Sequence, residues 1–170
     1  MTTATATANA TAPATAAQAV TGVTQKLQLA IRAAPDEVWR ALTDGEITPA
    51  YYVGFRAEFD LTPGGRYRYT AGGGDMITGT VLAVRPGQLL QTTFNGYWDP
   101  MVAQLPESTV RFRIVEPFMP MPGVTFLSCV HEGVADPEAA AHLEIGWVSI
   151  LSGLKTLLET GAPMVGGPQH

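Results

Sequence analysis

The feature that most constrains the fold of this chain is a long amphipathic helix predicted near its C-terminus. Its apolar residues recur at steps of three and four, which places them on one helical face: Leu143, Trp147, Ile150, Leu151, Leu154, Leu157 and Leu158. Asp136 and Pro137 suit the first turn of this helix, and Gly161 suits its end. Because the preceding segment reads as strands, this apolar face needs a sheet to cover it. We therefore expect the helix to lie across a curved antiparallel sheet, with space for a cavity between the two.

The segment before this helix has the patterns of strands and hairpin turns. Alternating apolar residues predict a strand from about Val23 to Arg32. Pro35, followed by acidic residues, predicts a short helix that ends at Gly45, and a second short helix or turn follows up to Tyr52. From Phe55 to His131, turn signals separate alternating runs, as in a meander of hairpins. The chain is therefore predicted to be an α+β protein.

The first short helix carries one apolar stripe. Val38, Trp39 and Leu42 are its members, and we expect Trp39 to be a core residue rather than a ligand contact.

Composition divides the chain into three parts. Residues 1–22 consist almost entirely of Thr, Ala and Asn, so we expect a disordered tail. Residues 23–162 form the predicted domain, and residues 163–170 are expected to be a flexible C-terminus.

Charge and cysteine content restrict the partners and the compartment. A net charge of −5 and a pI near 5.1 argue against binding to nucleic acid or to an anionic membrane surface. The sequence has no stretch of eighteen consecutive apolar residues, so no membrane span is predicted. The single cysteine, Cys129, cannot form an internal disulfide and lies in an apolar run, which favours a small buried side chain in a cytoplasmic protein.

Several side chains are candidates for the lining of the expected cavity. Aromatic residues in the strands, in the long connections and on the helix are expected to face inward, where they either line a ligand pocket or fill a core. The candidate ligand-binding residues are Tyr67, Tyr69, Phe94, Trp98, His131, Trp147, Leu151 and Leu154. His131 shares the parity of Leu127 and Cys129, so we place it near the cavity mouth, as a candidate general base or as a histidine satisfied at a strand end.

Two connections between strands are long and apolar. Residues 95–107 and 116–123 either cover a sheet edge or form a lid over the cavity mouth.

Other sites of chemistry are not indicated. His131 and Glu132 point to opposite faces of a strand, and His142 and Glu144 do not share a helical face, so no metal site is predicted. No nucleophile elbow is present, the glycines at 72–74 read as a hairpin turn, and no cofactor is expected.

The order of several motifs resembles a known superfamily. The segment Ile31–Gly45 is similar to the first-helix signature of the START-like, or SRPBCC, superfamily. The match continues in order through the segments 60–69, 77–82, 84–87 and 130–133. Gly146-Trp147, together with 154–161, resembles the branch named for homology to the activator of the heat-shock-protein-90 ATPase. The resemblance spans about residues 24–161.

This resemblance implies the helix-grip fold, in which a curved antiparallel sheet wraps around a long C-terminal helix and two short helices follow the first strand. Members of the superfamily bind hydrophobic small molecules, act as polyketide cyclases or aromatases, or confer antibiotic self-resistance. The sequence therefore favours a cytoplasmic monomer or homodimer that binds a hydrophobic or aromatic small molecule between sheet and helix. One alternative is a polyketide cyclase- or aromatase-like enzyme or an antibiotic self-resistance protein of the same fold. The other is an interaction protein that contacts a chaperone, and whether any reaction is catalysed stays open.

Overall fold

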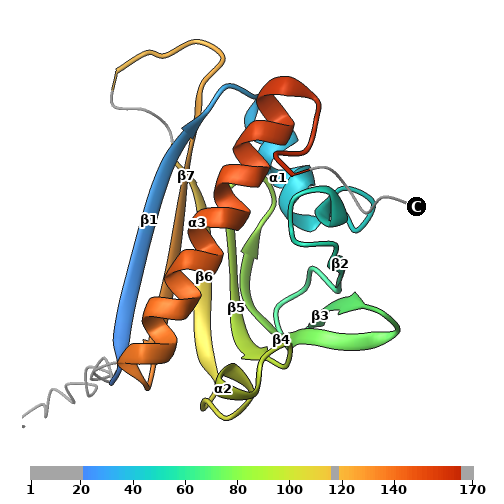
Figure 1. Ribbon diagram of the computed structural model, residues 1–170. Helices are drawn as coiled ribbons and strands as arrows, with labels where there is room; N and C mark the ends of the chain where they lie inside the picture. The colour runs from blue at the N-terminus through green and yellow to red at the C-terminus, as the bar shows by residue number, and fades with distance from the viewer. Residues whose placement is uncertain (1–20, 116–118, 166–170) are drawn as a thin grey trace, which may run out of the picture.

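A single curved sheet is the frame of the molecule. The computed structural model describes residues 21–115 and 119–165. Seven antiparallel strands are ordered β1-β7-β6-β5-β4-β3-β2, so the N-terminal strand lies at one edge, and the shortest strand lies at the other (Figure 1). The strands are β1 (Val23–Ile31), β2 (Arg56–Phe59), β3 (Arg66–Ala71), β4 (Gly74–Arg85), β5 (Leu89–Gly96), β6 (Ser108–Val115) and β7 (Thr125–Val134).

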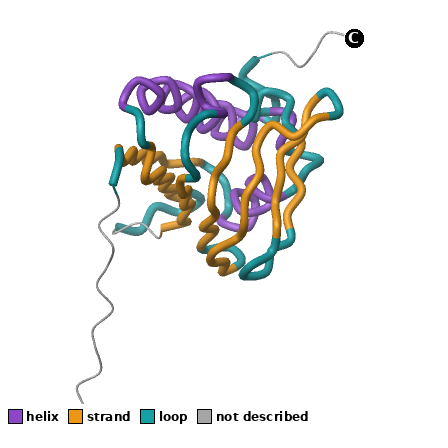
Figure 2. The backbone as a smooth tube through the Cα atoms, turned by 90° about the horizontal axis from the view of Figure 1, so that it is seen from below, coloured by secondary structure: helices purple, strands orange, loops and turns teal. Residues whose placement is uncertain are grey.

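From β2 to β7, each strand pairs in antiparallel fashion with the next strand along the chain, as the turn signals predicted. β1 closes the sheet by pairing with β7, in a register that sets Leu27 opposite Cys129 and Ile31 opposite Thr125. Figure 2 shows that the sheet curves and that the long helix lies on its concave side. The α+β helix-grip architecture expected from the sequence is confirmed.

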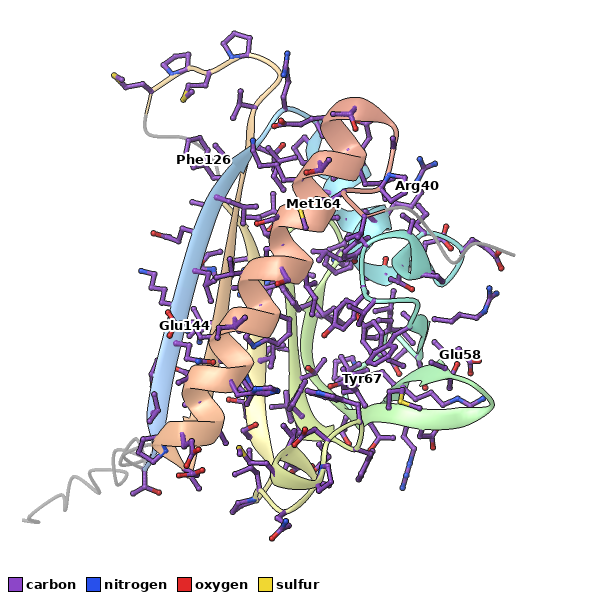
Figure 3. The ribbon with its side chains drawn as sticks, viewed as in Figure 1. Arg40, Glu58, Tyr67, Phe126, Glu144 and Met164 are labelled. Carbon is purple, nitrogen blue, oxygen red and sulfur yellow. The ribbon has the colours of Figure 1, made fainter. Side chains whose placement is uncertain are left out.

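The long helix α3 (Pro137–Thr160) has the predicted start and end. The Asp136 carboxylate accepts hydrogen bonds from the backbone N–H groups of Glu138 and Ala139, and Gly161 ends the helix with a positive φ of 75°. Leu143, Trp147, Leu151 and Leu154 are buried against the sheet, while Glu144 points outward (Figure 3).

Polar contacts tie α3 to β1 at both ends. Near its start, the buried Gln25 side-chain amide donates to the Ala140 carbonyl. Near its end, Lys155 Nζ donates to the Ala30 carbonyl at 2.6 Å, and Glu159 Oε1 accepts from the Arg32 backbone N–H at 2.8 Å. These bonds set the direction in which the helix crosses the sheet.

Two short helices follow β1, as expected. They are α1 (Pro35–Thr43) and the 3₁₀ turn η1 (Thr48–Ala50), and a further short helix, α2 (Pro100–Ala103), lies in the connection after β5. The Glu37 side chain accepts from the Ala34 backbone N–H at 2.8 Å and thereby secures the start of α1.

The prediction for Trp39 is wrong. The buried residues of α1 are Val38, Ala41 and Leu42, and Trp39 is half-buried outside the core. Trp39 and Val38 are adjacent, so the helix turns the two side chains about 100° apart. Ala41 lies three positions from Val38 and completes the stripe that faces the core.

The expected boundaries at residues 22 and 163 remain predictions. Residues 1–20 and 166–170 lie outside the described residues, and so does the stretch 116–118, which contains part of the second long connection.

Two glycines of α3 face different surroundings. A Cβ atom at Gly153 would lie 3.2 Å from the Tyr51 carbonyl oxygen and 3.3 Å from Tyr51 Cβ, so this glycine lets α3 approach the segment after η1. A Cβ atom at Gly146 would meet nothing within 4 Å. The first glycine serves close packing, whereas the second leaves open space.

We therefore expect opposite effects of substitution at these two positions. Gly153→Val should destabilise the fold by about 1–3 kcal/mol, because the added methyl groups press on the backbone at Tyr51. Gly146→Ala should stabilise it by about 0.5–1 kcal/mol, because glycine is the poorer helix former. Urea unfolding of the two variants measures both effects, and a stabilised Gly153→Val protein would contradict the close approach.

Candidate functional site

An open cleft lies beside the middle of α3. Its volume is about 280 Å³. One wall is α3, the other is the segment after η1, the floor is β4 and β5, and the loop before α2 closes one side. The lining residues are Tyr52, Val53, Phe55, Ile77, Phe94, Trp98, Leu143, Gly146, Trp147, Ser149 and Ile150. We call this site the α3 cleft.

The helical wall of the α3 cleft follows from the period of α3. Leu143, Gly146, Trp147 and Ile150 are spaced by three and four residues and so share one face. Gly146 is the member without a side chain, and the open space beside it belongs to the cleft. The sequence shows this glycine inside a helix, where it has a cost in stability, and the structure shows what the glycine leaves free.

Aromatic rings build the floor and the side of the α3 cleft. Phe94 lies at the centre, with ring centroids 6.0 Å from Trp98 and 6.2 Å from Trp147. Tyr52 stacks on Tyr69 at 4.5 Å and meets Trp147 edge-on at 6.3 Å. These contacts are within the range in which aromatic pairs attract one another, so the rings hold a fixed wall.

Backbone conformation shapes the rim at two points. Val53 has a positive φ of 45° although it is β-branched, and its side chain is 69% exposed. This conformation is unfavourable for valine and is followed by Gly54, which also has a positive φ. At Gly96, an added Cβ would lie 2.4 Å from the Trp98 ring, so the glycine allows the indole to fold back against β5.

Beneath the α3 cleft, His131 is completely buried in a network of side chains. Its Nδ1 accepts from the Trp147 indole N–H at 3.0 Å, and its Nε2 lies 2.7 Å from Ser108 Oγ. The Phe94 ring contacts the imidazole with centroids 4.8 Å apart. Burial without a counter-charge lowers the pKa of His131 to about 4.

The donor at Trp147 determines the protonation of the imidazole. An indole N–H can only donate, so Nδ1 must be the unprotonated nitrogen, and the neutral ring carries its hydrogen on Nε2. His131 therefore donates to Ser108 Oγ, whose own nearest acceptor is the Phe94 carbonyl at 3.5 Å. A histidine that activates a serine needs its lone pair directed at the hydroxyl. In this protein the hydrogen bond runs the other way, from the His131 Nε2–H group to Ser108 Oγ.

The structure separates the sequence candidates into three groups. Phe94, Trp98 and Trp147 line the α3 cleft. Tyr67 and Tyr69 point into the core between sheet and helix, where the remaining void measures about 10 Å³ (Figure 3 for Tyr67). His131, Leu151 and Leu154 are buried and line neither space. His131 thus lies below the indole of Trp147 and not at the mouth, because it sits in the middle of β7 and not at its end.

Sequence reasoning missed the residues that open the α3 cleft. Val53, Phe55 and Ser149 lie in a turn or on the polar side of the helix, where periodicity assigns no inward role. Ser108 was also missed as a partner of His131, because the two are 23 residues apart and meet through the pairing of β6 with β7. Gly146 was the one signal in the sequence. A glycine inside a helix lowers stability, so its presence points to a packing or functional reason at that position.

The buried hydroxyl and thiol groups are held neutral. Tyr51 donates to the Ala41 carbonyl at 2.8 Å and Tyr67 to the Thr93 carbonyl at 2.7 Å. Burial raises the pKa of both hydroxyls, and it also raises the pKa of the Cys129 thiol. Cys129 is therefore a buried apolar side chain, with no thiolate character at neutral pH.

The two long connections differ in what they cover. In the first, Val102 is buried while Tyr97 and Met101 are exposed, and Trp98 forms one side of the α3 cleft. In the described part of the second, Met119 and Met121 are exposed.

Among residues 21–115 and 119–165, no group of three or more His, Cys, Asp or Glu residues could hold a metal ion. In the same part of the chain, no helix has the length and apolarity of a membrane span.

Comparison with known proteins agrees with the fold. A family model described as activator of Hsp90 ATPase homolog 1-like protein matches residues 32–159. No curated protein matches the chain.

Solved structures share the fold over most of the chain. MLL2253 from Mesorhizobium loti is 27% identical with a TM-score of 0.64, over 80% of this chain and 96% of that one. DynU16, a protein of the dynemicin biosynthetic locus, is 25% identical with a TM-score of 0.66, over 82% of this chain and 48% of that one. The Aha1 dimer from Colwellia psychrerythraea is 18% identical with a TM-score of 0.64, over 82% of this chain and 98% of that one.

The buried imidazole generates a prediction about acid stability. Since the folded-state pKa of His131 is about 4 and the unfolded value is 6.5, the unfolded chain binds a proton first as the pH falls. The free energy of unfolding should therefore decrease by about 2 kcal/mol between about pH 7 and pH 5, and by about 3 kcal/mol near pH 4. Urea unfolding at a series of pH values measures this slope.

Two variants assign the slope to one histidine. His131→Phe should be less stable at every pH, because Trp147 and Ser108 lose their partner, but it should show little slope above about pH 5. His142→Gln, at an exposed position of α3, should keep the wild-type slope. A slope that survives in His131→Phe would contradict a neutral, buried imidazole.

Proposed function

The chain belongs to the activator of Hsp90 ATPase homolog 1-like family, and from this premise we propose that it binds a compact apolar or aromatic small molecule in the α3 cleft. The observation that supports the proposal is the cleft itself. About 280 Å³ of open space is lined by aromatic and aliphatic side chains, and no charged side chain of the described residues is among them. Ligand pockets in proteins are typically of this kind, concave and mostly apolar with few polar groups.

The size of the α3 cleft limits the ligand. A volume of about 280 Å³ lies near the lower end of known ligand pockets, which suits one or two fused rings. The concave side of the sheet offers little additional space, because the void between the sheet and the helix at Tyr67 and Tyr69 is about 10 Å³. The proposed ligand therefore lies beside α3, against Trp147 and Phe94, and not deep between helix and sheet.

The polar inventory favours binding over catalysis. Two lining residues carry hydroxyl groups. Ser149 already donates to the Ile145 carbonyl at 2.9 Å, and burial raises the pKa of the Tyr52 hydroxyl, so this group stays protonated at neutral pH. The nearest titratable group that sequence reasoning proposed, His131, is covered by Trp147 and uses both ring nitrogens. An enzyme of the cyclase type needs at least two converging polar groups at its ligand, so this alternative has less support.

An interaction protein is the second candidate. Ile145 and Val148 are 69% and 50% exposed on α3, and such residues can contact a partner protein. The relative from Colwellia psychrerythraea is described as a dimer. For this chain, a homodimer and a chaperone contact remain alternatives to ligand binding.

An intracellular location is part of the proposal. The single thiol, Cys129, is buried and free, as suits a reducing compartment.

Gly146 provides the sharpest test of the α3 cleft. Gly146→Leu should weaken binding of the neutral, naphthalene-sized fluorescent probe 6-propionyl-2-dimethylaminonaphthalene by about tenfold or more, because the new side chain extends into the cleft. The fold should persist, since the first added carbon meets no neighbour within 4 Å. Fluorescence titration of the folded full-length chain measures the dissociation constant.

Gly146→Ala is the matched control. It adds one carbon at the same position and should bind the probe almost as well as the wild type does. Unchanged binding in Gly146→Leu would place the probe elsewhere, and absence of binding in the wild type would contradict the proposed function.

A further inference from the structure

A second groove lies apart from the α3 cleft and has the opposite chemistry. Its volume is about 570 Å³, and it lies at the end of the sheet where β4 turns into β5. The lining residues are Pro35, Arg85, Gly87, Gln88, Leu89, Gln91, Arg111, Arg113 and Ile114. Three of the chain's ten lysine and arginine residues are in this set, although the protein as a whole has a net charge of −5. We call it the arginine groove.

Strand register brings the three arginines together. Arg111 and Arg113 are two positions apart on β6, so they point to the same face of the sheet. Phe112 lies between them and contacts Trp147 with ring centroids 5.8 Å apart, so the two arginines face away from α3. Leu89 on β5 lies opposite Arg113 on β6 and opposite Arg85 on β4. Directly paired residues share one face of a sheet, so Arg85 lies on the same face as Arg113.

The positive charge of the arginine groove is only partly compensated, although the Asp36 carboxylate lies 3.6 Å from where a Cβ atom at Gly87 would stand. Within the described part of the chain, neither Arg85 nor Arg113 forms an ion pair. Arg111 lies 3.9 Å from Glu132, the long limit of an ion pair. By contrast, Arg68 on β3 lies 2.7 Å from Glu58 and also has Asp75 nearby.

Arg111, which lines the arginine groove, carries a hydrogen-bond donor that lacks an acceptor. The Nε atom of Arg111 is buried and has no partner among the described residues. A buried donor without an acceptor is costly, and an arginine is the side chain that best matches the paired oxygens of a phosphate or carboxylate. Gln88 and Gln91 add amide groups that can donate to further oxygens of the same ligand.

We propose that the arginine groove binds a phosphate group, presented by a soluble phosphate ester or by a lipid headgroup. Arg111 and Arg113 hold the anion from β6, and Arg85 closes on it from the β4–β5 turn. The site is independent of the α3 cleft, because the two sets of lining residues have no member in common.

Pyrophosphate is the first probe. In a ¹⁵N NMR titration of the full-length chain at constant ionic strength, pyrophosphate should shift the Nε–H signal of Arg111 in a saturable way. Arg113→Gln and Arg85→Gln remove exposed side chains, so both variants should fold and bind about tenfold more weakly. A response that does not saturate, or that is unchanged in both variants, would overturn the proposal.

Arg40→Gln is the matched control for charge. Arg40 is exposed on α1 and projects into solvent outside the arginine groove, so its removal changes the net charge equally (Figure 3). Binding should be unchanged in Arg40→Gln and in Gly146→Leu. If Arg40→Gln weakens binding as much as Arg113→Gln does, the effect is one of overall charge, and the site is contradicted.

Vesicles distinguish the two sources of phosphate. If the protein sediments with phosphatidylcholine vesicles that contain phosphatidylinositol phosphate, and Arg113→Gln abolishes this sedimentation, the groove binds lipid headgroups. Saturable pyrophosphate binding without vesicle binding assigns it to soluble phosphate esters.

Discussion

The contact between α3 and the sheet organises the rest of the molecule, and Trp147 is at its centre. Its ring packs on Phe94 and Phe112, and its N–H group donates to His131 on the central part of β7. Contacts between aliphatic side chains have no preferred direction, so they define the rotation of a packed helix less sharply than a hydrogen bond does. The directed bond to a completely buried imidazole fixes the rotation of α3, and with it the set of residues that borders the α3 cleft.

This arrangement explains why little of the cavity expected between sheet and helix is open in the described interior. Tyr52, Tyr69 and Trp147 extend from three different parts of the fold, and the Tyr52 ring contacts both of the others over the concave side of the sheet. Their rings occupy the volume that a curved sheet and a helix would otherwise enclose, and leave a void of about 10 Å³. Open space remains where the rings end, at Gly146 and beside Val53. The cleft is therefore lateral, and its outer rim includes a residue in a strained backbone conformation.

Sequence patterns predicted the architecture because its determinants are local. The period of α3, its cap at Asp136 and its end at Gly161 each depend on residues close in the chain. The site depends on contacts between distant residues, and here prediction was less complete. The parity of His131 placed it correctly on the inward face of β7. Its partners, Ser108 and Trp147, are 23 and 16 residues away, so no local pattern could show that its nitrogens are already used.

At Gly146, the shape of the α3 cleft can change without a change in the packing of the core. In most clefts, the residues that shape the wall also support the core, so a change in selectivity has a cost in folding. Position 146 lies in the middle of a rigid helix, borders the cleft and touches no neighbour. Side chains of increasing size at this position would shorten the cleft in steps, while the contact between Trp147 and His131 one residue further on stays intact. The size of the side chain at this one position would therefore set how much of the α3 cleft stays open, without rebuilding the interior.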